Sequence, residues 1–176
     1  MQEQENAISI DWKAIFTKAF QLAIFISIAV FAPYFGSQLI TGTIVNAMLF
    51  IAASIMGLEY AVMLCFIPSL ISVSVGLLPM ILLPMIPFII GGNILMVYVY
   101  SKFERKSFWV GAVPGALVKF IFIWAAGMIL ANFVLQGVAK NIMLMISWPQ
   151  FATAIAGATL AFIFLKIVRK KHGTRN

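Results

Sequence analysis

Six runs of apolar residues fill most of this 176-residue sequence. They cover approximately residues 14–35, 39–56, 60–78, 85–101, 108–135 and 149–168. About 20 apolar residues in helical form cross the hydrocarbon core of a bilayer, where the backbone must satisfy its own hydrogen bonds. No run shows the apolar–polar alternation of strands in a membrane barrel. The sequence therefore predicts an all-α polytopic membrane protein with six transmembrane helices, folded as a single domain over residues 1–176.

The composition excludes several other classes of protein. Apolar residues make up 63% of the chain and charged residues 10%, whereas a soluble domain is about 45–50% apolar and about 25% charged. A chain this apolar is also not intrinsically disordered. The single cysteine, Cys65, excludes a disulfide framework, and the single histidine, His172, lies in the basic C-terminal tail. We therefore expect neither a metal site nor a cofactor.

Basic residues are distributed unevenly between the two sides of the predicted bundle. If the N-terminus is cytoplasmic, ten of the twelve Lys and Arg residues lie on that side: Lys13, Lys18, Lys102, Arg105, Lys106, Lys166, Arg169, Lys170, Lys171 and Arg175. Lys140 lies on the other side. Because cytoplasmic connections are enriched in Lys and Arg, this asymmetry predicts that both termini are cytoplasmic. The net charge of +7 then reflects topology and contact with the lipid bilayer, and we expect no nucleic-acid partner.

Lys119 lies in the middle of the fifth apolar run. It follows the start of that run by about 11 residues, which at ~1.5 Å per residue places it about 16 Å deep, near mid-bilayer. A lysine at this depth costs about 2.5–3.5 kcal/mol to insert. No carboxylate lies at the same depth, because Glu59 and Glu104 fall in connections. Lys119 therefore either binds an anionic or strongly polar ligand group, or is held by backbone carbonyls, Asn side chains and water.

A second group of polar and aromatic residues lies within the runs or near their outer ends: Asn46, Gln150, Trp148 and Tyr34 toward the outer side, and Asn93 near the middle of the fourth run. Amides inside a membrane bind ligands or form hydrogen bonds between helices. Aromatic rings sandwich flat ligands, but they also anchor helices at the membrane interface. With Lys119, these residues are candidates for one outward-facing pocket. For each amide, ligand binding and a hydrogen bond between helices both stay open, and for each aromatic residue, ligand binding and anchoring at the membrane interface both stay open.

Two further patterns concern packing and the connections. Ala19 and Ala23 form an Ala-x-x-x-Ala pair in the first run, and small residues recur at this spacing in the fifth and sixth runs. Such spacing allows close contact between helices, either within the bundle or with a partner subunit. The three prolines of the segment 79–87 exclude a regular helix there and predict a turn or a broken re-entrant segment. This segment is either a lid over the pocket or a stiff connection.

Motifs for catalysis and for nucleotide binding are absent from the sequence. It contains no Walker A loop, no Gly-x-Ser-x-Gly, no His-Glu-x-x-His and no pair of carboxylates within a run. We therefore expect the chain not to be an enzyme and not to drive proton-coupled transport by itself. A binding subunit that takes energy from another protein fits better. A structural or assembly subunit of a membrane complex and a small secondary carrier stay open as alternatives.

The sequence resembles the S components of energy-coupling factor (ECF) transporters, in particular a branch with no assigned substrate. The resemblance covers about residues 14–168 and rests on six short helices with both ends inside, on Ala19-x-x-x-Ala23, and on several short segments. These segments are Thr41-Gly42-Thr43-Ile44-Val45-Asn46-Ala47, Pro84-Met85-Ile86-Pro87-Phe88, Gly92-Asn93, Leu117-Val118-Lys119-Phe120 and Ser147-Trp148-Pro149-Gln150.

The resemblance implies a function in nutrient uptake across a prokaryotic plasma membrane. S components capture a vitamin or a metal-related nutrient in an outward pocket, then dock on a transmembrane coupling subunit that carries two ATPase subunits. By this resemblance Lys119, Asn93 and Gln150 are pocket residues, while Ala19 and Ala23 contact the coupling subunit. The chain lacks the ligand signatures of thiamine, riboflavin or biotin binders. A pocket lysine without an acidic partner favours a ligand with a carboxylate or phosphate group.

Overall fold

The computed structural model of the chain describes residues 11–133 and 148–173, and all secondary structure in these ranges is helical. Its elements in chain order are α1 (Trp12–Phe31), η1 (Ala32–Phe35), α2 (Gln38–Ile55), α3 (Leu58–Leu64), α4 (Phe66–Ser74), η2 (Met80–Met85), α5 (Ile86–Phe103), α6 (Phe108–Phe133) and α8 (Trp148–Gly173). Five helical segments in the described ranges are long and apolar enough to span a membrane. The prediction of an all-α polytopic membrane protein is confirmed.

Helix ends follow local signals in the sequence. Asp11 caps α1 by accepting a hydrogen bond from the Ala14 backbone N–H at 3.1 Å, and Ser37 lies at the N-cap of α2. Gly57 separates α2 from α3 with a φ of 100°, a conformation that side chains larger than hydrogen rarely adopt. These signals explain why α1 and α2 begin and end close to their predicted bounds.

The third apolar run differs from the single helix predicted over residues 60–78. It forms two short helices, α3 and α4, which meet at Cys65. Pro68 lies four residues after Leu64, so it cannot donate to the Leu64 carbonyl and its ring crowds that group. The helix therefore ends at Leu64, and the next one begins at Phe66. The segment with three prolines contains a 3₁₀ turn, η2, with Pro84 inside it, and leads directly into α5.

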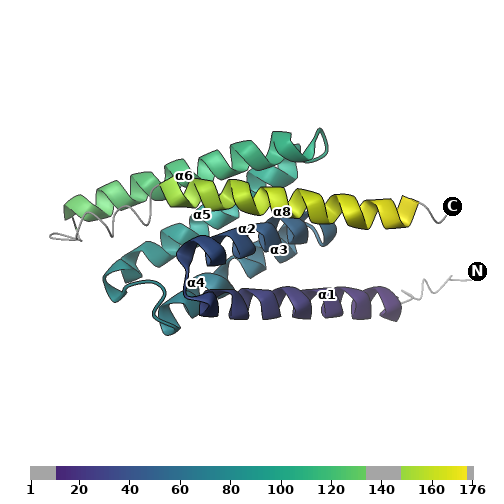
Figure 1. Cartoon of the computed structure of the whole chain (residues 1–176), viewed down its shortest axis with the longest axis horizontal. Coiled ribbons are helices and arrows are strands. Elements are labelled where there is room, and N and C mark those ends of the chain that lie inside the picture. The colour runs from purple at the N-terminus through teal and green to yellow at the C-terminus, as the bar shows by residue number, and fades with distance from the viewer. Residues whose placement is uncertain (1–10, 134–147, 174–176) are drawn as a thin grey trace, which may run out of the picture.

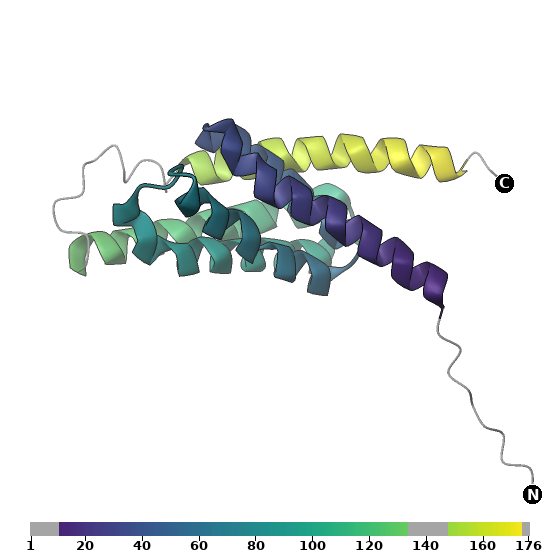
Figure 2. The ribbon, with the colours of Figure 1, turned by 90° about the horizontal axis from the view of Figure 1, so that it is seen from below.

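The helices form a bundle in which α2 is central. It packs against α8, α1, α3 and α5, while α5 and α6 form a tightly packed hairpin. The start of α1 and the end of α8 lie at one end of the molecule, together with the α5–α6 connection (Figure 1). α1 crosses the bundle obliquely and diverges from α8 toward the termini (Figure 2). This arrangement agrees with the predicted topology, in which both termini lie on the same side.

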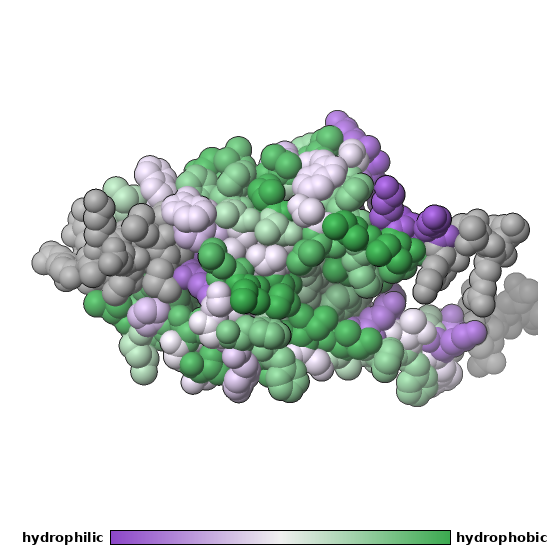
Figure 3. Space-filling model, in the orientation of Figure 1, coloured by the Kyte–Doolittle hydropathy of each residue, from purple (hydrophilic) through white to green (hydrophobic). Residues whose placement is uncertain are grey.

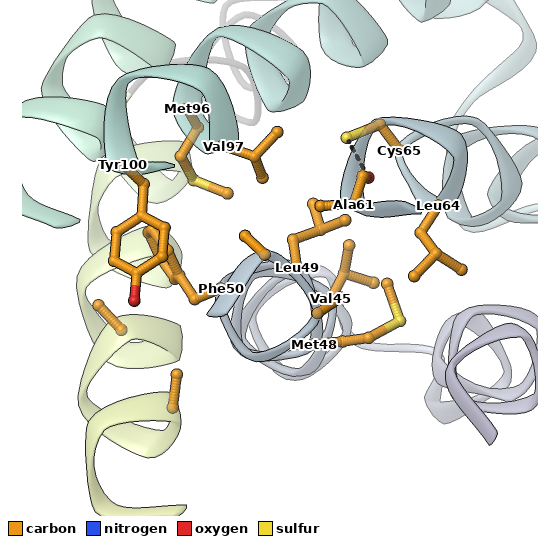
Figure 4. Packing of buried hydrophobic residues seen from close by; sticks show 14 of the residues in the cluster. Val45, Met48, Leu49, Phe50, Ala61, Leu64, Cys65, Met96, Val97 and Tyr100 are labelled. Carbon is orange, nitrogen blue, oxygen red and sulfur yellow. Dashed lines mark hydrogen bonds between the residues drawn. The ribbon is translucent and has the colours of Figure 1, made fainter. Parts of the chain in front are cut away.

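The surface and the core have the character expected in a bilayer. Hydrophilic side chains gather beside the termini, while the middle of the visible surface is largely apolar (Figure 3). Large apolar side chains such as Phe20 and Ile129 are exposed, as lipid-facing residues should be. Inside, α2 contributes Leu49 and Phe50 to a core shared with α3 and α5 (Figure 4). The Phe50 and Tyr100 rings pack edge to face with centroids 5.0 Å apart.

Small residues bring α6 close to α5. A Cβ atom on Gly111 or Gly115 would lie 2.7 Å from the backbone oxygen of Tyr100 or Met96, respectively. The close helix contact predicted from the four-residue spacing is confirmed for this pair. Ala19 and Ala23 of α1 are exposed instead, so they take no part in packing within the described bundle.

Candidate ligand-binding site

A cavity of about 90 Å³, lined by both polar and apolar residues, lies toward the end of the molecule opposite the start of α1 and the end of α8. The cavity is surrounded by the first turns of α2 and α8, by helix α4, by the first half of α5 and by the middle of α6. Its polar lining residues are Gln38, Thr41, Asn46, Ser69, Ser72, Asn93, Lys119, Gln150 and Thr153. Polar side chains at this density are rare within membrane spans, where they usually mark a functional site.

Lys119 is bound through a short chain of hydrogen bonds that crosses three helices. Its Nζ donates to Asn46 Oδ1 at 2.6 Å. Asn46 Nδ2 donates to Thr153 Oγ1 at 3.3 Å, and the Thr153 hydroxyl donates to the Gln150 backbone oxygen at 3.2 Å. The chain joins α6, α2 and α8, so it fixes the position of the ammonium group relative to the cavity.

The charge of Lys119 is not neutralised by any side chain that lines the cavity. The residue is 3% exposed, and its described neighbours around the cavity include no carboxylate. All five carboxylates of the chain lie at positions 3, 5, 11, 59 and 104. A buried charge without a counter-charge is costly, and one neutral amide compensates for only part of that cost. The site therefore favours an anionic group beside the Lys119 ammonium.

Glycines make room for these side chains. A Cβ on Gly92 would lie 2.8 Å from the Ile123 side chain and 3.5 Å from Lys119 Cγ, so the stem of Lys119 passes α5 at this position. A Cβ on Gly42 would lie 3.1 Å from the Thr153 side chain. Gly157 lets α8 approach the α2 backbone next to Asn46. The glycines thus allow α2, α5, α6 and α8 to bring their polar groups to one cavity.

The structure places the ligand candidates from the sequence in two different settings. Lys119, Asn93, Asn46 and Gln150 all line the cavity, and the first three are nearly completely buried. Trp148 and Tyr34 do not line it and are 60% and 65% exposed, as expected for anchors at the membrane interface.

Lys140, Ser147 and the predicted end of the fifth helix at residue 135 lie outside the described residues.

Thr153, Ser69 and Ser72 also line the cavity and were not singled out from the sequence. The spacing of these residues along their helices could have identified them. Thr153 follows Gln150 by three residues, and Ser72 follows Ser69 by three, so each pair shares one face of a helix. A hydroxyl residue three positions from a candidate amide was the missing clue for Thr153, whereas Ser69 and Ser72 had only their spacing from each other.

The cavity volume limits what the site holds in this structure. The cavity of about 90 Å³ is several times the roughly 10–15 Å³ that one water molecule needs on the same measure, so it has room for a small polar or charged group. Pockets for drug-sized ligands are about 300–1,000 Å³. A vitamin-sized ligand therefore needs a wider cavity than this one. Within the described ranges no cluster of His, Cys, Asp and Glu has the composition of a metal site.

Thr153→Val is expected to destabilise the folded protein by about 1 kcal/mol, because it leaves Asn46 Nδ2 without its buried acceptor. The measurement is thermal unfolding of the purified protein in detergent. Thr159→Val is the matched control, since the exposed Thr159 hydroxyl donates only to Ile155 O of its own helix. Equal stability losses in the two variants would show that the chain of hydrogen bonds at Lys119 contributes nothing.

Comparisons of the chain with known protein families, with curated proteins and with solved structures give no match. The resemblance to ECF S components therefore rests on the sequence features described above.

Proposed function

We propose that the chain is a non-enzymatic, solute-binding membrane subunit of an ATP-driven importer of the ECF type. It captures a small anionic nutrient at the cavity next to Lys119. The observation that carries this proposal is the buried Lys119, which lines a cavity and has no carboxylate among the described residues around that cavity. A carboxylate or phosphate oxygen would supply the missing charge and accept hydrogen bonds from the ammonium group.

The position of the cavity supports uptake from outside. If the basic end of the molecule is cytoplasmic, the cavity lies in the outer half of the bundle, where a solute arrives before transport. The assignment to a prokaryotic plasma membrane follows from the resemblance and belongs to the proposal.

The outer face of α1 supports docking on a coupling subunit. Ala19 and Ala23 are exposed and lie one turn apart, a spacing of small residues that allows another helix to pack closely. In the proposed importer these two residues contact the transmembrane coupling subunit, and two ATPase subunits supply the energy.

A structural or assembly subunit is the second candidate function. It is favoured by the contact of Lys119 Nζ with Asn46 Oδ1 at 2.6 Å, because this hydrogen bond also joins α6 to α2 without any ligand. In that case the cavity would hold water only, and replacement of Lys119 would change stability but not the binding of any solute.

Native mass spectrometry of the protein purified in mild detergent from its own membrane tests the proposal. We expect a bound anionic small molecule and an associated coupling subunit with two ATPases. Ala19→Leu is expected to remove the coupling subunit while the small molecule stays bound. Intact complexes that never contain a small molecule, in wild type or in variants, would favour the structural subunit.

A further inference from the structure

A groove of about 480 Å³ lies between α1 and α8, which diverge from each other in Figure 2. Its lining residues are all apolar apart from Gln21. Ala47 and Met48 of α2 are buried and form its floor, while Ile24 of α1 and Leu160 of α8 line its walls and are 45% and 49% exposed. The groove is therefore open to the surroundings of the bundle, and its chemistry suits a hydrocarbon chain.

The groove has the length of the hydrocarbon in one leaflet of a bilayer. Along α2 it extends from Ile44 to Ile55, about 16 Å at ~1.5 Å per residue. Ile44 lies two residues from Asn46, whose side chain binds Lys119 at the depth predicted to be mid-bilayer. Ile55 is the last residue of α2, on the side of the molecule where α1 begins. Since one leaflet contributes about 15 Å of hydrocarbon, the groove covers one leaflet from the midplane to the interface.

The two helices that form the walls of the groove are basic where they reach this interface. The exposed basic residues there are Lys13 and Lys18 of α1 and Lys166, Arg169 and Lys170 of α8. The Lys18 Nζ lies 5.8 Å from the centre of the Tyr60 ring in the first turn of α3, which places its charge near the end of the groove at Ile55. The carboxylates Asp11, Glu59 and Glu104 at this end of the molecule are fewer than its basic residues. The interface beside the groove therefore attracts anionic headgroups.

The groove does not coincide with the docking surface proposed on α1. Ala19 and Ala23 are each two positions from Gln21, and about 100° per residue places them on the opposite side of the helix. A coupling subunit that packs on Ala19 and Ala23 therefore leaves the groove open.

We propose that the groove between α1 and α8 binds one anionic phospholipid of the leaflet at the basic end, with an acyl chain along α2 and the headgroup beside the basic residues of α1 and α8. A chain in the groove contacts three helices at once, and dispersion forces add up with the number of contacts. A transmembrane helix of another protein would fill the apolar part but has no negative charge to place at the interface. This inference goes beyond solute capture and does not depend on it.

The test is native mass spectrometry of the full chain, freed of lipid in detergent and then titrated with one phospholipid at a time. The probes are dioleoylphosphatidylglycerol and dioleoylphosphatidylcholine, which share their acyl chains and differ in headgroup charge. One phosphatidylglycerol is expected to bind with a dissociation constant about 5-fold lower than that of phosphatidylcholine, the factor expected from one basic side chain beside an anionic headgroup.

Two pairs of variants assign the binding to the groove. Ile24→Trp fills the groove from α1 and is expected to weaken the binding of phosphatidylglycerol by about 5-fold or more, because the indole takes the space of the acyl chain. Ile26→Trp is its control, since Ile26 is 37% exposed on the same helix and does not line the groove. Leu160→Trp and its control Ile163→Trp repeat the test on α8, where Ile163 is 50% exposed and outside the groove. A folding defect in one variant therefore does not decide the result.

A third pair tests the headgroup. The double variant Lys13→Gln and Lys18→Gln is expected to reduce the preference for phosphatidylglycerol to less than about twofold, because the charge beside the groove is lost. The double variant Lys102→Gln and Lys106→Gln removes the same charge from the end of α5 and the α5–α6 connection, which do not line the groove. It is expected to keep the preference of the wild type.

Three results would overturn this inference. If Ile24→Trp and Leu160→Trp bind phosphatidylglycerol as their controls do, the lipid does not occupy the groove. If both phospholipids bind equally well, or if the two double variants behave alike, the anionic headgroup is not what the site selects. If a second copy of the chain or another membrane protein occupies the groove in place of lipid and is lost in Ile24→Trp, the groove is a protein interface instead.

Discussion

Lys119→Met is expected to weaken the binding of small carboxylates by about 10- to 100-fold, because it removes the charged hydrogen bond that holds the anion. Methionine keeps most of the length of the side chain, so the stem still fits beside Gly92. The unliganded variant is expected to stay folded, with a stability within about 1 kcal/mol of wild type, because removing a buried charge that has no counter-charge offsets the loss of its hydrogen bond to Asn46 Oδ1. The measurement is the dissociation constant of propanoate from thermal unfolding.

The matched control for this variant is Lys102→Met, which makes the same change at an exposed position in the last turn of α5. It is expected to leave the affinity for propanoate unchanged. An unchanged affinity in Lys119→Met as well would mean that carboxylates bind elsewhere. The Lys119 cavity would then have no part in capturing them.

Gly157→Val is expected to lower the free energy of unfolding by about 1–3 kcal/mol or more, and to abolish carboxylate binding. A Cβ at this position would lie 2.7 Å from Ala47 N and from Asn46 Cβ, and 2.8 Å from Thr43 O. Backbone atoms of α2 cannot move aside as a flexible side chain would, so α8 must shift away. The shift would move Asn46 relative to Thr153 and release Lys119 Nζ from its position.

Thermal unfolding and propanoate titration of Gly157→Val, side by side with Ala156→Val, check this expectation. Ala156 is exposed on the same helix, so the added bulk there meets lipid or detergent only. Ala156→Val is expected to behave as wild type in both measurements. If Gly157→Val were as stable as this control, α8 would not approach α2 as closely as the structure shows.

The sequence predicts the fold because the membrane leaves few alternatives. The length and apolar character of the runs predict helices, and their bounds follow from caps such as Asp11 and from glycines such as Gly57. The interruption of the third run between α3 and α4 depends on a single residue, Pro68, and not on the length or the apolar character of the run. Pro68 forbids the hydrogen bond to Leu64, and this effect places the break several residues before the proline itself.

The arrangement around Lys119 was harder to predict than Lys119 itself. Its depth and the absence of a nearby carboxylate can be read from residue positions alone. Its partner, Asn46, lies 73 residues away on another helix. Because these helices are apolar nearly all round, their hydrophobic pattern does not indicate which side faces the bundle. The pairing of α2 with α6 therefore depends on packing, which the sequence pattern does not reveal.

Helical geometry explains which aromatic and polar candidates reach the cavity. Trp148 and Gln150 are two residues apart on α8, and about 100° per residue places them on nearly opposite sides of the helix. Gln150 and Thr153 are three residues apart and share the side that faces the cavity. Trp148 and Gln150 were therefore incompatible as lining residues of one pocket, and Thr153 was the better candidate.

Anion capture at this site requires that solutes reach Lys119 from the side opposite the start of α1 and the end of α8. Thiol labelling tests this directly, with a Cys65→Ala background to remove the native thiol. In this background Lys119→Cys is treated, in intact cells, with the anionic and membrane-impermeant reagent methanethiosulfonate ethylsulfonate. Tyr34→Cys serves as the exposed control, and Ala116→Cys as a control one turn away on α6 that is fully buried and outside the cavity.

We predict that the reagent labels Lys119→Cys and Tyr34→Cys from outside and leaves Ala116→Cys unlabelled. Prior addition of propanoate is not expected to protect Lys119→Cys, because this variant lacks the ammonium group that binds the anion. The account would be contradicted if Lys119→Cys stayed unlabelled from outside while Tyr34→Cys reacted, or if it reacted only with reagent supplied from the cytoplasmic side.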